Sequence, residues 1–409
     1  MKIVFLVHQF YPDHYTGTEK FLLGLAKSCQ RMGHRVKVIT YSFRPNSFFD
    51  QESGDILLKE DIYQKIPVLY LKQKHPPAEF GHELKSQELT DLATQILADE
   101  KPDLLHAAHT MRLAEFVQVA RQMEIPYVLT LTDFFLICPK ANLMTSVNSL
   151  CAGPENGKAC RELCSEIPAR TIDARLAEAD SLLTGAKCVV APSKFLAAMY
   201  LKEYPHLNIK HIGYGVSYAN IRKNNKTYKA GDELTFFYGG SITRHKGVQV
   251  LIEAFKKMKG YAKLKIYGSG TYEAVIKNLA KYDPRVEFCG VFSSEQMGEI
   301  LNQIDVIIVP SIWYENTPIM LLEALASDVP AVVTDLGGMT EVVKDNINGR
   351  AFRISDPDHL AQALSSMVDD PEILNTFKDN IKSQFIPSVE QEGLAYQREY
   401  QAICQAKAG

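Results

Sequence analysis

The chain lacks any long hydrophobic segment and any strong excess of charge of one sign. No uninterrupted apolar run approaches the roughly 20 residues that a membrane-spanning helix needs. The first apolar run, residues 3–7, is too short for the hydrophobic region of a signal peptide. We therefore expect a strand there and a cytoplasmic protein, at most peripheral to the inner face of a membrane. A formal net charge of -3 offers no general attraction for nucleic acid, which is not expected as a partner.

Paired cysteine motifs are also missing, although the chain has 8 cysteines. Cys138, Cys151, Cys160 and Cys164 form a cluster in the sequence. Without an export signal we expect a reducing compartment, which disfavours a disulfide framework. The spacings lack the C-x2-C pairs of common zinc sites, so we expect no bound metal. Four thiolates on one zinc ion remain the alternative for this cluster.

The length and the pattern of apolar runs predict two α/β domains. A chain of 409 residues exceeds what one hydrophobic core usually organises, and 46% apolar residues are enough for sizeable cores. Short Val/Ile/Leu runs alternate with amphipathic stretches, as in βαβ units around a parallel sheet. Expected strands are 2–7, 35–40, 66–71, 103–107, 126–131 and 188–191, then 234–239, 263–267, 286–289, 305–309 and 331–334.

Glycines and a proline mark the expected boundaries. We place the hinge near Gly213-Tyr214-Gly215, because glycine permits the backbone angles that a crossover between domains requires. The predicted domains are 1–214 and 215–386. Residues 387–409 contain a last helix, expected at 387–403 and opened by Pro387, whose apolar side needs a partner.

The segment 311–323 carries the strongest functional signal. It follows an apolar strand, and Pro318 suits the first position of a helix that Asn316 or Thr317 would cap. Such a helix start binds anions. Glu315 lies in the loop and Glu323 on the helix, so the two carboxylates are placed to accept hydrogen bonds from two polyols. The alternative is a capped helix facing solvent, with Glu323 a surface residue.

The start of the second domain offers a second candidate. Gly240 and Ser241 follow a strand, and Arg244 and Lys246 precede an amphipathic helix, an arrangement that suits a diphosphate. The alternative is a tight turn with ordinary surface cations. Gly268 lies in a G-x-G turn that would let a nucleotide approach the backbone. In the first domain, Asp133 follows a strand, where open α/β sheets bind ligands, or caps the next turn.

These motifs together resemble the retaining GT-B glycosyltransferases of family 4. Glu315 and Glu323 match the E-x7-E pattern of that family. Further segments that resemble the family are 241–255, 285–291, 335–341, 348–349, 11–13 and 17–19. The likeness covers nearly the whole chain.

The resemblance implies a fold and an activity. The fold is GT-B, with two doubly wound Rossmann-like domains facing across a cleft and the last helix returning to the first domain. The activity is transfer of a hexosyl group from a nucleotide diphosphate sugar, most often a UDP-sugar, to a hydroxyl of a saccharide or lipid-linked saccharide, with retention. We expect a role in polysaccharide or glycolipid assembly. No cofactor or metal is required, because cationic side chains and helix amides replace the ion.

The resemblance also assigns roles to individual residues. The histidine-bearing loop after strand 103–107 supplies two acceptor-side candidates, His106 and His109. We favour His109, because it lies farther into the loop. The expected catalytic residues are Glu315, Lys246, Arg244 and His109; the donor-binding residues are Gly17, Gly240, Ser241, Gly268, Val291, Asn316, Thr317, Pro318 and Glu323; and the acceptor-side residues are His106 and Asp133.

Two departures from the family pattern keep other functions open. Ser241 stands where the family has arginine, and Thr132 where it often has histidine. A non-catalytic sugar-nucleotide-binding scaffold with the same fold is therefore the alternative function. A phosphorylase is a second alternative, which requires a lysine carrying pyridoxal phosphate. Asp356-Pro357-Asp358 has the letters of a metal motif, but its position predicts a helix cap.

Overall fold

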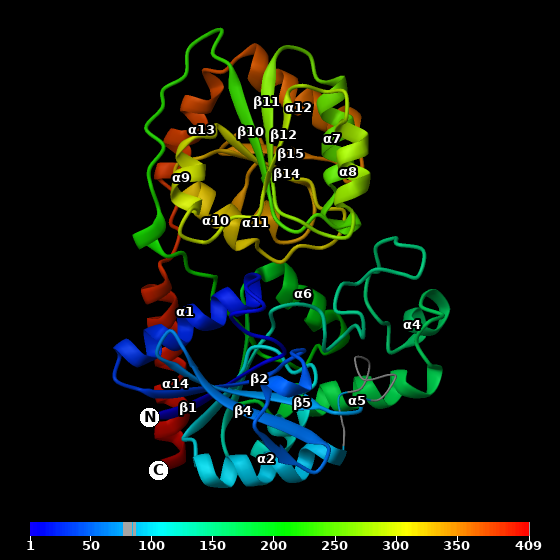
Figure 1. The fold of residues 1–409 in the computed structure, drawn as a ribbon, viewed down its shortest axis with the longest axis vertical. Helices are drawn as coiled ribbons and strands as arrows, with labels where there is room; N and C mark the ends of the chain where they lie inside the picture. Colours follow the sequence, from blue (N-terminus) through cyan, green and yellow to red (C-terminus); the bar gives the residue numbers. More distant parts are fainter. Residues whose placement is uncertain (77–83, 85–86, 409) are drawn as a thin grey trace. The chain divides into compact units, whose positions relative to one another are not determined.

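The computed structural model describes residues 1–76, 84 and 87–408 and divides into two compact units (Figure 1). The N-terminal unit is Met1–Tyr214 with Val389–Gly409, and the C-terminal unit is Gly215–Ser388. Each unit is an α/β sheet with covering helices, as the sequence predicts. Within the described ranges, no helix combines the length and the apolar character needed to cross a membrane.

The N-terminal unit contains a nine-stranded sheet in the order β3-β4-β5-β2-β1-β6-β7-β8-β9. Its strands are β1 (Lys2–Val7), β2 (Arg35–Tyr41), β3 (Gln51–Ser53), β4 (Ile56–Tyr63), β5 (Ile66–Gln73), β6 (Leu104–Ala107), β7 (Tyr127–Thr130), β8 (Cys188–Ala191) and β9 (Ile209–His211). The predicted all-parallel sheet is wrong at one edge, where β3, β4 and β5 pair antiparallel. The turn between β4 and β5 uses Gln64 and Lys65, both at positive φ, instead of the Asn-Gly or Asp-Gly pair that signals a hairpin.

Seven α-helices of the N-terminal unit are described, with one short 3-10 turn at Asn46–Phe48. The helices are α1 (Gly17–Arg31), α2 (Gln87–Glu100), α3 (Ala114–Gln122), α4 (Lys158–Leu163), α5 (Ala169–Gly185), α6 (Lys194–Glu203) and α14 (Val389–Ala408). The last of these begins two residues after the predicted start and continues to the end of the described chain.

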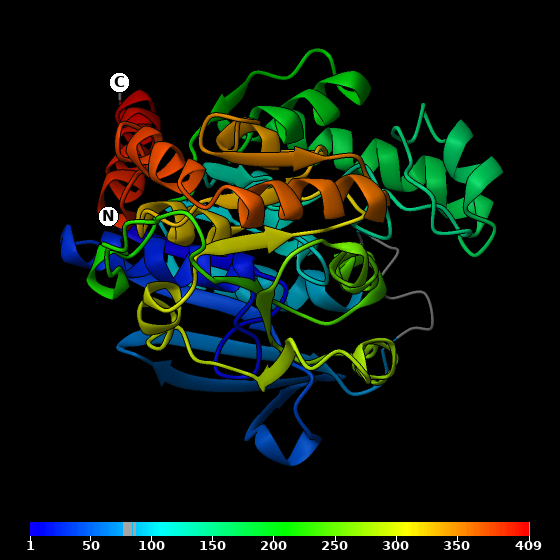
Figure 2. The ribbon, with the colours of Figure 1, turned by 90° about the horizontal axis from the view of Figure 1, so that it is seen from above.

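Helix α14 packs against α1 within the N-terminal unit (Figure 2). Tyr396 and Tyr400 on α14 are fully buried, so this helix contributes to the core of the unit. The two helices approach closely at Gly393, where a Cβ atom would lie 2.1 Å from Ser28 Oγ. The absence of a side chain at this position permits the contact.

The C-terminal unit has a six-stranded parallel sheet in the order β12-β11-β10-β13-β14-β15. Its strands are β10 (Leu234–Gly239), β11 (Ala262–Tyr267), β12 (Val286–Gly290), β13 (Val306–Val309), β14 (Ala331–Thr334) and β15 (Gly349–Phe352). Its helices are α7 (Val248–Lys257), α8 (Glu273–Ala280), α9 (Met297–Asn302), α10 (Ile319–Ala326), α11 (Met339–Val342), α12 (Pro357–Asp369) and α13 (Ile373–Lys382), with 3-10 turns at Tyr218–Asn220 and Arg244–Lys246.

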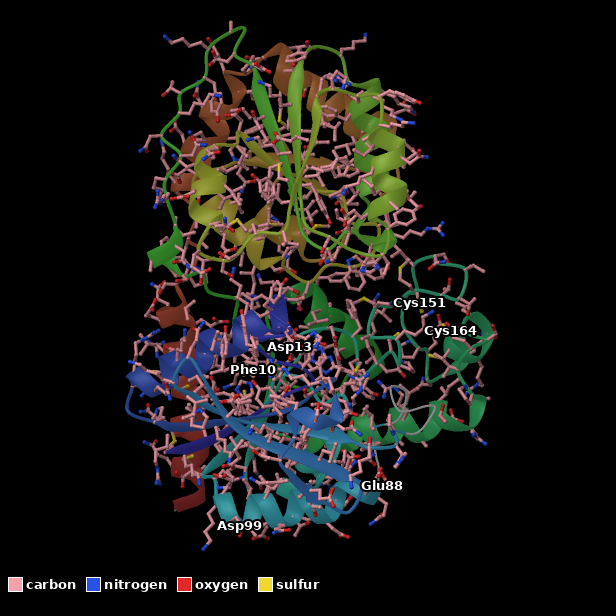
Figure 3. All side chains as sticks on the ribbon, viewed as in Figure 1. Phe10, Asp13, Glu88, Asp99, Cys151 and Cys164 are labelled. Atoms are coloured by element: carbon pink, nitrogen blue, oxygen red, sulfur yellow. The ribbon has the colours of Figure 1, made fainter. Side chains whose placement is uncertain are left out.

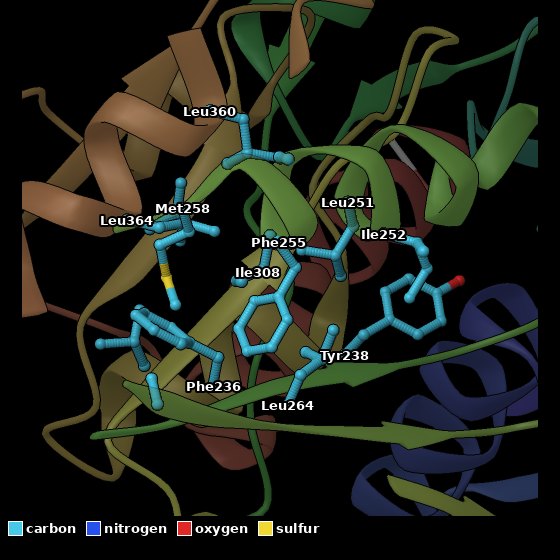
Figure 4. Close-up of a cluster of buried hydrophobic side chains, with 14 of the residues drawn as sticks. Phe236, Tyr238, Leu251, Ile252, Phe255, Met258, Leu264, Ile308, Leu360 and Leu364 are labelled. Atoms are coloured by element: carbon cyan, nitrogen blue, oxygen red, sulfur yellow. The ribbon is translucent and has the colours of Figure 1, made fainter. Parts of the chain in front are cut away.

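The core of the C-terminal unit forms between the sheet and helices α7 and α12 (Figure 4). Phe236 on β10 and Phe255 on α7 are fully buried and meet edge to face, with ring centroids 6.3 Å apart. Truncating a buried phenylalanine to alanine typically costs about 3–5 kcal/mol. This core fixes β10 and α7, and therefore the loop that joins them. Asp356 caps α12 by accepting a hydrogen bond from the His359 amide, which confirms the predicted cap.

We predict that Gly393→Ala lowers the free energy of unfolding of the N-terminal unit by about 1–3 kcal/mol, the usual cost of overpacking. The added methyl group would clash with Ser28 and push α14 away from α1. Gln401→Ala, at an exposed position of the same helix, is the control and should have little effect. Urea unfolding of both variants checks this, and equal stability of Gly393→Ala and the wild type would contradict the described packing.

Candidate active site

Both sheets have a point where the strand order reverses, and the predicted site residues gather there. In the C-terminal unit the chain runs outward from β10 in one direction and from β13 in the other. In the N-terminal unit the same reversal lies between β1 and β6. The carboxyl ends of the strands at such a reversal leave a crevice in which open α/β sheets bind ligands. The loops after β10, β13, β1 and β6 are therefore the candidate site loops.

In the C-terminal unit, the loops after β10 and β13 are held together through their backbones. The Ile312 amide donates a hydrogen bond of 2.9 Å to the His245 carbonyl. Gly247 has φ +74°, and a Cβ atom there would lie 1.8 Å from the carbonyl oxygen of Pro310. Only glycine fits this approach, and it places Lys246 directly beside the loop that carries Glu315.

Glu315 is the centre of a hydrogen-bond network. Its Oε1 atom accepts hydrogen bonds from Lys246 Nζ, Ser311 Oγ and Trp313 Nε1, each 2.7 Å long. Lys246 Nζ also lies 4.9 Å from the centre of the Trp313 ring, a cation–π contact. The backbone carbonyl of Glu315 accepts a 2.9 Å hydrogen bond from the Gly338 amide, so the loop after β14 also fixes the main chain of Glu315. The side chain and backbone of Glu315 are held from three loops.

The surroundings of Glu315 keep its carboxylate charged. Burial raises the pKa of Glu315. The adjacent Lys246 charge and the hydrogen bonds from Lys246, Ser311 and Trp313 together lower it by more, so the net pKa lies below the ordinary value. A buried carboxylate with a lowered pKa is a strong hydrogen-bond acceptor at neutral pH. This is the chemistry needed to hold the hydroxyl groups of a sugar.

Helix α10 begins one residue later than predicted, at Ile319, with Pro318 at the N-cap position in an extended conformation. Thr317 and Glu323 are both buried. Glu323 is 3% exposed, which overturns the alternative that it is a surface residue on a solvent-facing helix. The structure therefore offers a second buried carboxylate on the helix that follows Glu315.

The remaining donor-side candidates occupy neighbouring loops of the C-terminal unit, except Gly17, which is the first residue of α1 in the N-terminal unit. Gly240 donates its amide hydrogen to the Tyr267 carbonyl at 3.1 Å, and Ile242 donates to Ser269 at 2.8 Å, so the turn containing Gly268 packs on the turn after β10. The candidates that are more accessible than Glu315 include Ser241, Arg244, Val291 and Asn316. Among the described residues, the Arg244 side chain is not part of the Glu315 network, so Lys246 alone supplies its cation.

In the N-terminal unit, His109 and Asp133 form a hydrogen-bonded pair. His109 Nδ1 accepts a hydrogen bond from the Met111 amide at 3.1 Å, so Nε2 carries the hydrogen that it donates to Asp133 Oδ2 at 2.8 Å. Both ring nitrogens of His109 are thus in use. Asp133, whose side chain is 33% exposed, is the more accessible member of the pair, and the role of His109 toward an acceptor hydroxyl stays a prediction.

A small, partly open hollow lies at this pair. Its lining includes His109, Thr110, Thr132, Asp133, Phe135 and Tyr200. Asp133 also accepts a hydrogen bond from the Phe135 amide at 2.8 Å, as expected for the capping alternative. Asp133 therefore both shapes the turn after β7 and faces the hollow.

His106 belongs to the core, and its predicted acceptor-side role is wrong. It is 0% exposed, with Nδ1 2.5 Å from Tyr400 Oη and Nε2 2.8 Å from Thr130 Oγ1. Burial lowers its pKa to about 3, so the ring is neutral. Thr130 Oγ1 lies 2.9 Å from Tyr396 Oη, so the network joins α14 to β6 and β7. No ring nitrogen remains for an acceptor hydroxyl.

One residue at the reversal point of the N-terminal sheet, His8, escaped the analysis of the sequence. His8 follows β1, and its ring lies 4.0 Å from the His109 ring. Burial and then the nearby His109, Arg112 and His14 lower its pKa well below the ordinary value. Its Nε2 atom is 3.8 Å from the fully buried Glu19 on α1, the helix whose first residue is the predicted donor-loop residue Gly17. The position of His8 immediately after the first strand was the available signal.

The four clustered cysteines are all buried. Figure 3 shows two of them, Cys151 and Cys164, near α4. Burial raises the pKa of Cys160 to about 12 and also raises the pKa values of Cys151 and Cys164. Cys160 and Cys164 pack in a small apolar cluster with Ile167. In the part of the chain that the structure describes, no group of His, Cys, Asp or Glu is arranged to hold a metal ion. These thiols thus pack as small hydrophobic side chains.

Comparison with solved structures identifies the fold as GT-B. Sucrose-phosphate synthase from Thermosynechococcus elongatus superposes with a TM-score of 0.74 at 18% identity, covering 99% of each chain. Anabaena HepE superposes with a TM-score of 0.70 at 17% identity, covering 98% of this chain and 99% of that one. Identities at this level establish the shared fold alone.

Sequence comparison gives the family. Residues 220–384 match the model "Glycosyl transferases group 1" and residues 16–204 match "Glycosyl transferase 4-like domain". An uncharacterised glycosyltransferase of Methanocaldococcus jannaschii is 25% identical over 94% of both chains, and the Escherichia coli O-antigen chain mannosyltransferase C is 21% identical over 94% of this chain and 93% of the other. The chain belongs to the group 1 glycosyltransferases of the GT-B fold and is a hexosyltransferase.

We predict that Gly247→Ala separates the loops after β10 and β13. The new Cβ atom would overlap the Pro310 carbonyl, a backbone group that cannot rotate away. Gly231→Ala is the matched control, because Gly231 has φ +85° and open space around its Cβ position. The control carries only the cost of positive φ, about 1–2 kcal/mol. Denaturant unfolding and nucleotide titration should show a larger loss of stability and of affinity for Gly247→Ala; matching losses in both variants would contradict this packing.

Proposed function

We propose that this enzyme transfers a hexosyl group from a nucleotide diphosphate sugar to a hydroxyl of a saccharide or lipid-linked saccharide, with retention at the anomeric carbon. The observation that carries the proposal is the Lys246–Glu315 pair at the reversal point of the C-terminal sheet. It combines a cation for a diphosphate with a charged acceptor for sugar hydroxyls. The C-terminal unit would hold the donor, and Asp133 of the N-terminal unit would contact the acceptor.

The chemistry assigned to each group follows from its charge and burial. Lys246 would stabilise the negative charge that develops on the leaving diphosphate, and preorganised charge of this kind is usually the largest catalytic contribution. Glu315 would orient the transferred sugar by accepting hydrogen bonds from its hydroxyls. Glu323, buried on α10, would accept a hydrogen bond from the ribose. We propose that no divalent cation is needed, so a chelator should leave transfer unchanged.

Relatives suggest which donor and acceptor to test first. HepE was solved with UDP and glucose, and an Escherichia coli relative, 31% identical over 87 residues, is named as a UDP-Gal:α-D-GlcNAc-diphosphoundecaprenol α-1,3-galactosyltransferase. UDP-glucose and UDP-galactose are therefore the first donors, and a lipid diphosphate saccharide is the first acceptor. Thermal shifts with UDP-, GDP- and ADP-sugars extend the search, because a ligand that binds the folded state stabilises it.

We predict that Glu315→Gln and Glu323→Gln have different kinetic effects. Glu315→Gln keeps the shape of the side chain but removes the charged acceptor, so kcat should fall by about tenfold or more while free nucleotide still binds. Glu323→Gln should weaken the binding of free nucleotide, because its carboxylate would hold the ribose. Isothermal titration with UDP and initial rates with the active donor separate the two.

The outcome of these assays distinguishes the proposal from its alternatives. Wild-type rates and affinities in both variants would contradict the roles of the two glutamates. Nucleotide binding without transfer or donor hydrolysis in the wild type would indicate a sugar-nucleotide-binding scaffold. Retention is tested by NMR of the first-formed product, whose anomeric configuration should equal that of the donor; inversion would overturn that part of the proposal.

A further inference from the structure

Trp313, the single tryptophan of the chain, contacts both Glu315 and Lys246 of the candidate donor site. It lies in the loop between β13 and α10. Its Nε1 atom donates a hydrogen bond to Glu315 Oε1 at 2.7 Å. Its ring centre lies 4.9 Å from Lys246 Nζ and 4.4 Å from the centre of the His245 ring. One side chain therefore bridges the carboxylate and the cation.

The hydrogen bonds of Glu315 are distributed unevenly between its two oxygens. Trp313, Ser311 and Lys246 all donate to Oε1. Over the described residues, no protein group donates to Oε2. Turning the carboxylate away from this orientation would break all three hydrogen bonds to Oε1 at once. The network thus fixes the orientation of the side chain and leaves one oxygen for a ligand.

We propose that Trp313 is a positioning residue of the transfer reaction: its N–H group keeps Glu315 ionised and turned so that Oε2 meets the donor sugar, while its ring holds Lys246 beside the same carboxylate. The identity of the group that meets Oε2 rests on the function proposed above. The hydrogen bond between Trp313 and Glu315 is a property of the free protein and is testable without a substrate.

The proposal predicts the direction of a change in pH dependence. The titratable groups that face Glu315 are Lys246, His245 and Tyr238. Burial raises the pKa of Tyr238, and burial and Lys246 lower the pKa of His245, so both are neutral at pH 7. Burial also raises the pKa of Glu315, against the lowering by Lys246, Ser311 and Trp313. Removing the Trp313 N–H removes one lowering contribution, so Glu315 would become protonated at a higher pH.

A fluorescence titration tests the contact directly, because light absorbed by tryptophan but not by tyrosine excites Trp313, the single tryptophan of the chain. As the pH falls through the pKa of Glu315, the loss of the charge beside the indole should change the emission of the wild type. In Glu315→Gln, which has no charge to lose, most of this change should disappear. The same pH transition in both proteins would overturn the proposal.

Kinetics test the positioning role. Trp313→Phe keeps the ring and removes the N–H group, and Ser311→Ala removes another donor to the same oxygen. Each should lower kcat by about tenfold, the effect of one hydrogen bond to a charged group, and move the acidic limb of the kcat/KM profile to higher pH. The Kd for UDP should be unchanged. Tyr282→Phe, at a side chain 87% exposed in the same unit, is the control and should match the wild type.

The remaining outcomes are also decisive. If Trp313→Phe loses stability, UDP affinity and kcat together while the acidic limb stays in place, Trp313 has only a structural role and the proposal fails. If Trp313→Phe does not fold, Ser311→Ala decides the pH shift. If the wild type transfers from none of UDP-, GDP- and ADP-glucose, the proposed function fails, but the fluorescence titration still decides the contact between Trp313 and Glu315.

Discussion

The ion pair between Lys246 and Glu315 is the interaction on which the candidate donor site depends. The side chains of Lys246 and Glu315 are 24% and 11% exposed, so neither is well solvated by bulk water. Removing one partner would leave the other as a poorly compensated charge. Ser311 and Trp313 reinforce the pair by donating to the same carboxylate oxygen. A charged, oriented carboxylate can therefore persist in a largely buried position.

The sheet topology explains why this pair forms at all. Lys246 and Glu315 are 69 residues apart in the chain, but their loops follow β10 and β13, which are neighbours in the sheet. The strand order reverses between these strands, and such a reversal leaves a crevice at their carboxyl ends. The packing of Phe236 on Phe255 fixes the loop after β10. The hydrogen bond from the Gly338 amide to the Glu315 carbonyl fixes the loop after β13. In this way ordinary packing positions the charges.

Local patterns in the sequence were sufficient for the fold class, because apolar periodicity and glycine-rich turns act over short distances. They also singled out Glu315 and Lys246 as candidates, whose roles stay predictions. They were insufficient where a role depends on a distant partner. His106 looks like a site residue until its bond to Tyr400, 294 residues away, is known. Trp313 shows no role until its contacts with Lys246 and His245 are seen. The β4–β5 hairpin was missed because its turn lacks the usual residues.

A double-mutant cycle on kcat/KM tests the central claim most directly. Lys246→Met, Glu315→Gln and the double variant would be assayed with the active donor, with unfolding measured in parallel. If the two side chains act as one unit, the double variant should be little worse than the poorer single variant, with a coupling energy of about 1–3 kcal/mol. Strictly additive losses would show that the two groups act independently and would contradict the account.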